Sequence, residues 1–160
     1  MTGKTHLYGV NVLWTGDRGV GTRGYRDYSR EHQIRAPSKP YIPGSSDANF
    51  RGDAARWNPE ELLVASVSAC HKLWYLHLCA VGGVVVMAYE DNAEGVMRED
   101  EDGGGRFTSV TLRPHARLAA GSDPVRAAAL HHDAHAKCFI ANSVNFPITV
   151  EPSFGVEGAT

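Results

Sequence analysis

Cysteine is scarce in this sequence, and charge of either sign is nowhere concentrated. The 160 residues contain three cysteines, Cys70, Cys79 and Cys138, which exclude a disulfide scaffold and leave thiol chemistry, metal binding or burial as roles. Sixteen lysines and arginines are scattered among 18 acidic residues. We therefore expect no nucleic-acid groove and no binding to an anionic membrane surface.

Two kinds of hydrophobic segment are also missing. Residues 1–6 lack the apolar core of a signal peptide, so we expect a cytoplasmic protein. The longest apolar segment, residues 62–81, is interrupted by His71, Lys72 and His77, and is not expected to span a membrane. The sequence shows no internal repeat and no low-complexity segment. Its length favours a single domain over residues 1–160 with a real core.

A helix that begins near Asn58 is the central element of the prediction. Asn58 is a good N-cap residue, and Pro59 suits the first helical turn. Glu60 and Glu61 suit the positive end of the helix dipole. Residues 62–81 contain no proline or glycine, which predicts a helix of about six turns. Its apolar residues go most of the way round, as is typical of a buried central helix.

The rest of the pattern predicts strands and one more helix. Strand-like alternation predicts five strands, over residues 7–14, 22–34, 84–89, 107–118 and 146–150. Pro114 indicates an edge or bulge. Residues 36–57, rich in proline and glycine, predict a long ordered loop. Residues 125–138 predict a second helix, capped by Ser122 or Asp123. This order predicts an α+β fold in which an antiparallel sheet packs on the central helix and the second helix.

Cys70 lies in the middle of the central helix, and two opposite interpretations apply to it. A thiol buried among leucine and valine behaves as a small core hydrophobe and is inert. A thiol beside a cation, with an opening that admits substrate, is a nucleophile. Cys79, nine residues further along, falls on the opposite side of the helix and is expected in the core.

The motif Asn-Pro-Glu-Glu-Leu-Leu, followed by Cys70 on a long helix, resembles the signature of the OsmC/Ohr family. This family comprises osmotically inducible protein C and the organic hydroperoxide resistance proteins. Cys138 lies near the end of the second helix and before the last strand, where the family has its second redox cysteine. The order of elements agrees over nearly the whole chain. The resemblance implies an OsmC-like fold and a thiol-dependent peroxidase that needs no cofactor or metal.

The resemblance assigns a role to each of the two cysteines. Cys70 attacks an organic hydroperoxide and yields an alcohol and a sulfenic acid. Cys138 condenses with that sulfenic acid to an intrachain disulfide, which an external dithiol reduces. The apolar surroundings of Cys70, which include Trp74 one turn along, favour an organic hydroperoxide over hydrogen peroxide.

The same resemblance implies an ion pair at the site. Glu60 matches the carboxylate that orients an active-site arginine. Three arginines are candidates for that partner. Arg18 falls where the hydroperoxide-resistance branch has it, Arg51 falls near where the other branch has it, and Arg30 is a third possibility.

Two positions depart from the family pattern. Phe139 follows Cys138 where the family often has proline, and His71 follows Cys70 where an apolar residue is common. These differences predict a divergent branch of the family.

A metal site and a binding protein are the alternatives. His131, His135 and Cys138 share one face of the second helix, and Cys70 or His71 would complete a zinc-type ligand set. The competing interpretation makes His131, His132 and His135 ordinary solvated helix residues. An acyl-ligand-binding protein would use an apolar cleft and an inert Cys70, and a slow alkylation of Cys70 would identify it.

The helix geometry, combined with the assigned roles, predicts an obligate, intertwined homodimer. Glu60 and Cys70 are ten residues apart, a rise of about 15 Å along a helix. Glu60 therefore cannot orient an arginine beside its own Cys70 unless that arginine spans the gap. Two copies crossing antiparallel near Ala65 would place Glu60 of one chain beside Cys70 of the other. Small residues at that point, namely Ala65, Ser66, Ser68 and Ala69, permit the approach.

Overall fold

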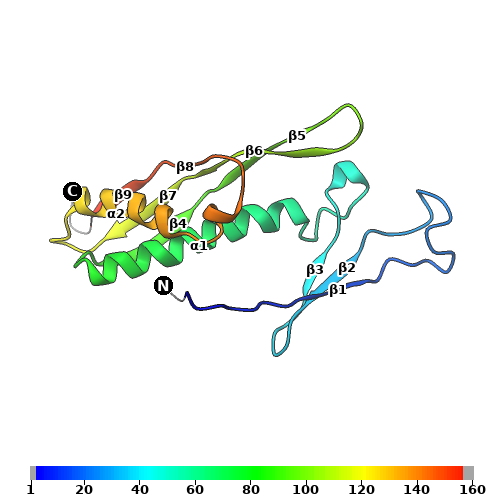
Figure 1. The fold of residues 1–160 in the computed structure, drawn as a ribbon, viewed down its shortest axis with the longest axis horizontal. Helices are drawn as coiled ribbons and strands as arrows, with labels where there is room; N and C mark the ends of the chain where they lie inside the picture. The colour runs from blue at the N-terminus through cyan, green and yellow to red at the C-terminus, as the bar shows by residue number, and fades with distance from the viewer. Residues whose placement is uncertain (1–2, 157–160) are drawn as a thin grey trace. The chain divides into compact units, whose positions relative to one another are not determined.

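The computed structural model describes residues 3–156, and within them it contains two α-helices, two short 3-10 helices and nine strands (Figure 1). Contacts divide the chain into two compact units, Met1–Leu62 and Leu63–Thr160. The α+β class predicted from the sequence is confirmed. The single domain over residues 1–160 stays a prediction.

The first unit contains a small antiparallel sheet in the order β1-β2-β3. Its strands are β1 (Asn11–Trp14), β2 (His32–Arg35) and β3 (Ile42–Gly44). The strand predicted over residues 22–34 is wrong, because only its end belongs to β2. The intervening chain turns instead: the Asp17 carboxylate accepts the backbone N–H groups of Gly19 and Gly21, each at 2.9 Å. Both glycines have positive φ, which suits glycine.

The long loop predicted over residues 36–57 is also partly wrong. It contains β3 and the 3-10 helix η1 (Ala48–Phe50). Asp47 caps η1 by accepting the N–H of Asn49 at 2.7 Å, a local contact that competes with extended structure. A backbone hydrogen bond of 2.9 Å from Ser45 to Trp57 then closes the loop.

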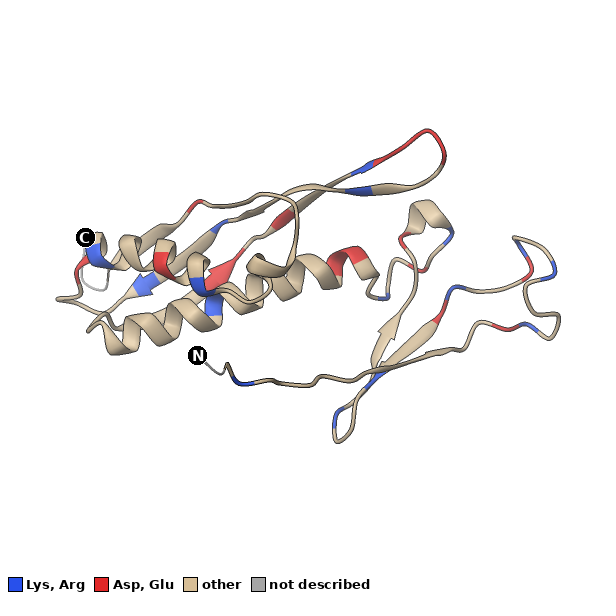
Figure 2. Cartoon of the chain, in the orientation of Figure 1, with Lys and Arg blue, Asp and Glu red and all other residues tan. Residues whose placement is uncertain are grey.

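Helix α1 (Pro59–Val81) forms where it is predicted, but its burial differs from the prediction. Only one stripe of α1, at a spacing of four residues, is fully buried in the single chain, and it consists of Val67, His71, Tyr75 and Cys79. Leu73 is 63% exposed and Val81 is 71% exposed. By length and composition alone α1 could cross a membrane, as could many core helices of soluble proteins. Figure 2 shows its two acidic residues at the first turn, and Lys72 is the one formal charge beyond them.

The second unit builds two three-stranded sheets, ordered β4-β7-β9 and β5-β6-β8. Their strands are β4 (Val86–Asp91), β5 (Glu94–Glu99), β6 (Gly105–Leu112), β7 (Pro114–Leu118), β8 (Ile148–Val150) and β9 (Ser153–Val156). The strand predicted over residues 107–118 is interrupted at Arg113, and neither β5 nor β9 is predicted. The sheets are mixed, since β8 and β9 pair in parallel with β6 and β7.

Arg113, between β6 and β7, and Asp91, the last residue of β4, link the two sheets. Asp91 accepts the Arg113 backbone N–H at 2.7 Å. The Arg113 guanidinium lies 3.6 Å from Glu94, the first residue of β5, and 3.3 Å from Glu151, which lies between β8 and β9. Because all three side chains are well exposed, these ion pairs contribute little to stability and chiefly fix the local geometry.

Helix α2 (Pro124–Lys137) covers the sheet β4-β7-β9 together with α1. Asp123 caps it, as predicted, by accepting the N–H of Val125 at 2.9 Å. Tyr75, Cys79, Leu118 and Leu130 are among the fully buried residues of this core. Burial of each large apolar side chain contributes about 1.5–3 kcal/mol. The predicted core position of Cys79 is confirmed.

Candidate active site

The start of α1 is fixed by a reciprocal pair of hydrogen bonds. The Glu61 N–H donates to the Asn58 side chain at 2.7 Å, and the Asn58 N–H donates to the Glu61 carboxylate at 3.3 Å. This capping box satisfies two N–H groups that would otherwise lack partners. It also sets the position of Glu60, which is partly buried in the first turn.

Cys70 and Cys138 lie together between α1 and α2. Both thiols are free, and a hydrogen bond joins the side chains of Cys138 and Cys70. Cys70 is partly exposed, whereas Cys138 is fully buried. A molecule arriving from solvent therefore reaches Cys70 first.

Cys138 is the residue directly after α2, and its surroundings keep it protonated. Burial, together with the hydrogen bond to Cys70, raises the pKa of the Cys138 thiol to about 11. The backbone N–H of Ala141, from the 3-10 helix η2 (Ala141–Ser143), donates to its sulfur at 3.4 Å and opposes this effect. At neutral pH Cys138 is thus a poor nucleophile, and the better-exposed Cys70 is the candidate for attack on a substrate.

Trp74 on α1 contacts Phe139, the residue that follows Cys138. The rings of Trp74 and Phe139 meet edge to face, with centroids 5.6 Å apart. The Lys137 ammonium lies 5.7 Å from the centre of the Trp74 ring. Phe139, one of the two departures from the family pattern, therefore contributes an apolar contact next to Cys138.

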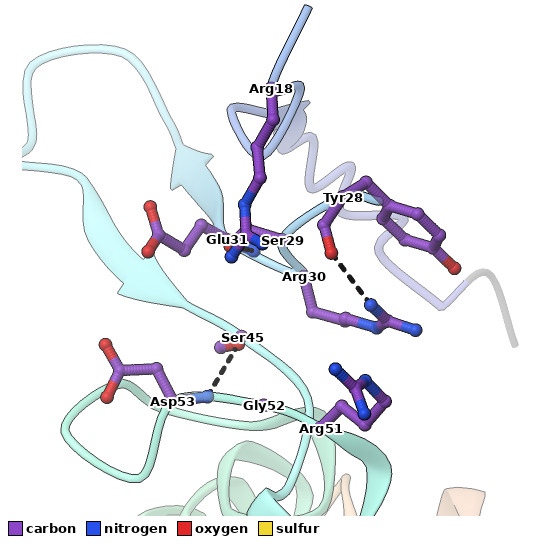
Figure 3. Close-up of a pocket in the computed structure, with 9 residues that line it drawn as sticks. All are labelled: Arg18, Tyr28, Ser29, Arg30, Glu31, Ser45, Arg51, Gly52 and Asp53. Carbon is purple, nitrogen blue, oxygen red and sulfur yellow. Dashed lines mark hydrogen bonds between the residues drawn. The ribbon is translucent and has the colours of Figure 1, made fainter. Parts of the chain in front are cut away.

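The three candidate arginines line one cavity of about 250 Å³ in the first unit. We call it the arginine pocket, and its lining residues are Arg18, Tyr28, Ser29, Arg30, Glu31, Ser45, Arg51, Gly52 and Asp53. Figure 3 shows the arginine side chains reaching it from three separate segments. Its two acidic residues are both paired with Arg56, at 3.5 Å from Glu31 and 3.4 Å from Asp53. The pocket therefore carries an excess of positive charge.

Arg30 is held in place by its own loop. Its guanidinium donates to the carbonyl oxygens of Tyr25 and Tyr28, each at 2.8 Å. It also lies over both rings, 4.5 Å from the centre of Tyr25 and 4.1 Å from that of Tyr28. Arg30 thus organises the loop, and this leaves Arg18 and Arg51 as the arginines better able to bind a ligand.

Arg51 adopts an unusual backbone conformation. Its φ of 63° lies in the left-handed region, which costs a residue with a side chain about 1 kcal/mol. Backbone strain of this kind is concentrated at functional sites. Arg51 is the C-cap residue of η1, and its side chain lines the arginine pocket.

The structure brings together two subsets of the predicted site residues. Cys70 and Cys138 meet in the second unit, and Arg18 and Arg51 line the pocket of the first unit. Glu60 lies in the first turn of α1. The catalytic roles assigned to these residues stay predictions.

His131 differs from both sequence interpretations, whereas His132 is exposed and His135 is partly exposed. His131 is 3% exposed, so it is not solvated, and its Nδ1 lies 2.9 Å from Nε2 of the equally buried His71. No group of three or more histidine, cysteine or acidic residues among residues 3–156 is arranged to hold a metal ion. His71 occupies the buried stripe of α1, and its spacing of four from Val67 and Tyr75 was the signal in the sequence for this position.

Comparisons with known proteins agree on one fold. A solved OsmC-like protein of unknown function from Vibrio cholerae is 30% identical, with a TM-score of 0.81, covering 92% of this chain and 99% of that chain. An organic hydroperoxide resistance protein from Legionella pneumophila is 20% identical, with a TM-score of 0.66, over 95% of this chain and 100% of that one. Among curated proteins, none matches the sequence significantly.

A third solved structure, the organic hydroperoxide resistance protein OhrB of Bacillus subtilis, is 21% identical, with a TM-score of 0.60, over 94% of this chain and 100% of that chain. The last two likenesses establish the fold alone. The family described as OsmC-like protein matches residues 52–153, which include both cysteines of the dithiol. The chain therefore belongs to the OsmC-like protein family.

Proposed function

We propose that this protein is a cytoplasmic thiol peroxidase that reduces organic hydroperoxides to alcohols. The observation that carries the proposal is the hydrogen-bonded contact between the partly exposed thiol of Cys70 and the buried thiol of Cys138. Two relatives with the same fold are organic hydroperoxide resistance proteins. We expect no nucleic acid or membrane among its partners.

The first step consumes the hydroperoxide at Cys70. The Cys70 thiolate attacks the outer peroxide oxygen, the O–O bond breaks, and the products are a sulfenic acid and an alkoxide that takes up a proton. A guanidinium stabilises both the thiolate and the charge that develops on the leaving oxygen. Arg18 and Arg51 are the proposed sources, since Arg30 is engaged by Tyr25 and Tyr28.

The second step closes a disulfide. Cys138 attacks the Cys70 sulfenic acid, an S–S bond forms and water leaves. An external dithiol then reduces the disulfide by exchange and restores both thiols. The contact between the two thiols favours this closure, because a reacting pair held in place gains a large advantage over a bimolecular reaction.

The proposal includes a homodimer. Beyond Glu61, helix α1 carries one formal charge, and much of its apolar surface is exposed in the single chain. A second copy of this chain would cover that surface. Ala65 and Ala69 are exposed and small, so two α1 helices could approach closely there, with Glu60 of one chain beside Cys70 of its partner. Sedimentation at micromolar concentration tests this, and a folded, active monomer would contradict it.

A comparison of Cys70→Ser with Cys79→Ser tests the peroxidase activity. Consumption of cumene hydroperoxide with an excess of a dithiol is measured for both variants and the wild type. Cys70→Ser should lower the rate at least about 1000-fold, because a hydroxyl cannot replace the thiolate. Cys79→Ser, which alters a cysteine on the other side of α1, should keep most of the activity of the folded protein. Turnover by Cys70→Ser, or slow alkylation of wild-type Cys70 at pH 7, would refute the enzyme and favour a binding protein.

A further inference from the structure

A pair of buried histidines joins the same two helices that carry the dithiol. His71 on α1 and His131 on α2 are 1% and 3% exposed, and their facing nitrogens, Nε2 and Nδ1, are 2.9 Å apart. The two rings are nearly parallel, with an angle of 5° between their planes. Neither residue has a role in the proposed chemistry.

Both imidazoles are neutral, which makes the bond between them directional. Burial lowers the pKa of His71 to about 4 and that of His131 to about 3. A neutral imidazole has one donor and one acceptor nitrogen, so one ring donates and the other accepts. The ring of Tyr75 stacks on His131 at a centroid distance of 3.7 Å and restricts its tilt.

Breaking this bond would leave all four nitrogens of the pair without hydrogen-bond partners. His71 Nδ1 and His131 Nε2 are buried and lack hydrogen-bond partners within the described chain. If the helices slid apart, the two bonded nitrogens would lose their partners as well. A buried polar group without a partner costs about 1–3 kcal/mol. The hydrogen bond therefore opposes sliding of α2 along α1, which an apolar contact would tolerate.

The histidine pair and the dithiol are close along both helices. Cys70 directly precedes His71 on α1, and Cys138 follows His131 by seven residues, or two turns of α2. The histidine pair and the dithiol are therefore two contacts between the same pair of helices, α1 and α2. Disulfide closure is sensitive to this arrangement, because Cα atoms more than about 7 Å apart cannot be bridged without movement of the backbone.

We propose that His71 and His131 are positioning residues that hold α2 in register with α1, so that Cys138 captures the Cys70 sulfenic acid before it is oxidised further. This inference rests on the proposed peroxidase function. In this proposal neither histidine reacts with the peroxide or with a sulfur. They act on the second step, in which Cys138 loses its proton, the S–S bond forms and water leaves.

Three variants separate the hydrogen bond from packing. His131→Phe keeps an aromatic ring against Tyr75 but removes the bond to His71. His131→Gln keeps a side chain that can donate to or accept from His71. The double variant His71→Leu/His131→Phe leaves no polar group of the pair in the interface, which protects the fold. His132→Gln changes an exposed neighbour on α2 and is the matched control.

Two rates and one equilibrium are measured on the full chain. Sulfenic acid formation is followed by trapping after one equivalent of cumene hydroperoxide, and disulfide closure by mass spectrometry of quenched samples. His131→Phe and the double variant should form sulfenic acid within about twofold of the wild type and close the disulfide at least about tenfold more slowly, with Cys70 sulfinic acid accumulating. His131→Gln should recover most of the closure rate, and His132→Gln should match the wild type.

Measuring the equilibrium of disulfide formation tests the positioning role independently of the peroxidase activity. In glutathione buffers without peroxide, the double variant should lower the equilibrium constant for the Cys70–Cys138 disulfide about tenfold, or about 30 mV. If wild-type Cys70 forms no sulfenic acid but this shift is found, the peroxidase proposal fails and the positioning role holds. If the double variant folds and closes its disulfide at the wild-type rate and equilibrium constant, the positioning role is refuted.

Discussion

The arginine pocket and the interface between α1 and α2 keep polar groups in opposite states. In the pocket, Arg18 and Arg51 are exposed and charged, with no carboxylate paired to either among the described residues. At the helix interface, His71, His131 and Cys138 are buried and neutral, and they bond to one another or to a neighbouring thiol.

The difference matters for chemistry. An exposed guanidinium is free to bind an anion and reorganise at little cost, whereas buried neutral groups hold a fixed geometry because each lost bond leaves an unsatisfied atom. The first arrangement suits the stabilisation of charge, and the second suits a thiol pair that must react with each other. The comparison predicts that changes in the pocket alter rates, and that changes in the interface alter stability and redox products.

After the loss of Cys70 itself, removal of the buried Cys138 thiol should have the largest effect. Cys138→Ser keeps the size of the side chain but cannot form a disulfide. The first equivalent of hydroperoxide should be consumed at the wild-type rate, while later turnover should fall about 100-fold because intramolecular capture is lost. Mass spectrometry should find Cys70 sulfinic acid in place of the Cys70–Cys138 disulfide. Unchanged turnover without over-oxidation would remove Cys138 from the chemistry.

Acid should destabilise the helix interface next most strongly. The folded pKa values of His71 and His131, about 4 and about 3, lie below the value of 6.5 for free histidine. The unfolded chain therefore binds more protons between those values, and stability falls as the pH drops below about 6.5. His135 lowers the pKa of His71 further, and Asp91 opposes it.

The expected loss for the pair is on the order of 3 kcal/mol between pH 7 and pH 5. Urea unfolding at several pH values measures it. The double variant His71→Leu/His131→Phe should lose most of this pH dependence, and His132→Gln should retain it. An unchanged slope in the double variant would show that other groups carry the acid sensitivity.

The arginine pocket should give the smallest stability effects and a selective effect on rate. Arg18→Ala and Arg51→Ala should each change the free energy of unfolding by less than about 0.5 kcal/mol, as is usual for exposed positions. The arginine that serves Cys70 should slow sulfenic acid formation about 10- to 100-fold when replaced.

Arg30→Ala provides the contrast within the pocket. It should destabilise the chain by about 1–2 kcal/mol, because two hydrogen bonds to backbone carbonyls and two ring contacts are lost. Chemical unfolding measures the change in stability, and single-turnover kinetics measure the rate of sulfenic acid formation. A stable Arg30→Ala protein with a large rate defect would make Arg30, and not Arg18 or Arg51, the catalytic arginine.

Local signals in the sequence were sufficient for much of the fold. Asn58, Pro59 and Asp123 act through contacts within a few residues, so both helix starts were predictable. β9 was missed because its parallel pairing with β7 depends on residues nearly forty positions away. The break at Arg113 was only hinted at by Pro114, since the groups that stabilise it, Asp91 and Glu151, are remote in sequence.

In the candidate site, too, local features could be predicted from the sequence, and contacts between distant residues could not. The motif around Glu60 and Cys70 is local and could be recognised directly. The contact between Cys138 and Cys70 depends on how α2 packs on α1. The spacing along the chain could suggest this contact but could not establish it. The pairing of His71 with His131 joins positions 60 residues apart, and on α2 alone His131 was indistinguishable from its exposed neighbour His132.

The central claim is that Cys70 and Cys138 form one redox-active dithiol, and intact-mass and peptide mass spectrometry test it most directly. The reduced protein is treated with one equivalent of cumene hydroperoxide, quenched with an alkylating agent and digested without reductant. The account predicts one intrachain disulfide between the peptides of Cys70 and Cys138, with Cys79 alkylated after unfolding. Oxidised Cys70 without that disulfide, or a Cys70 that stays a free thiol, would contradict it.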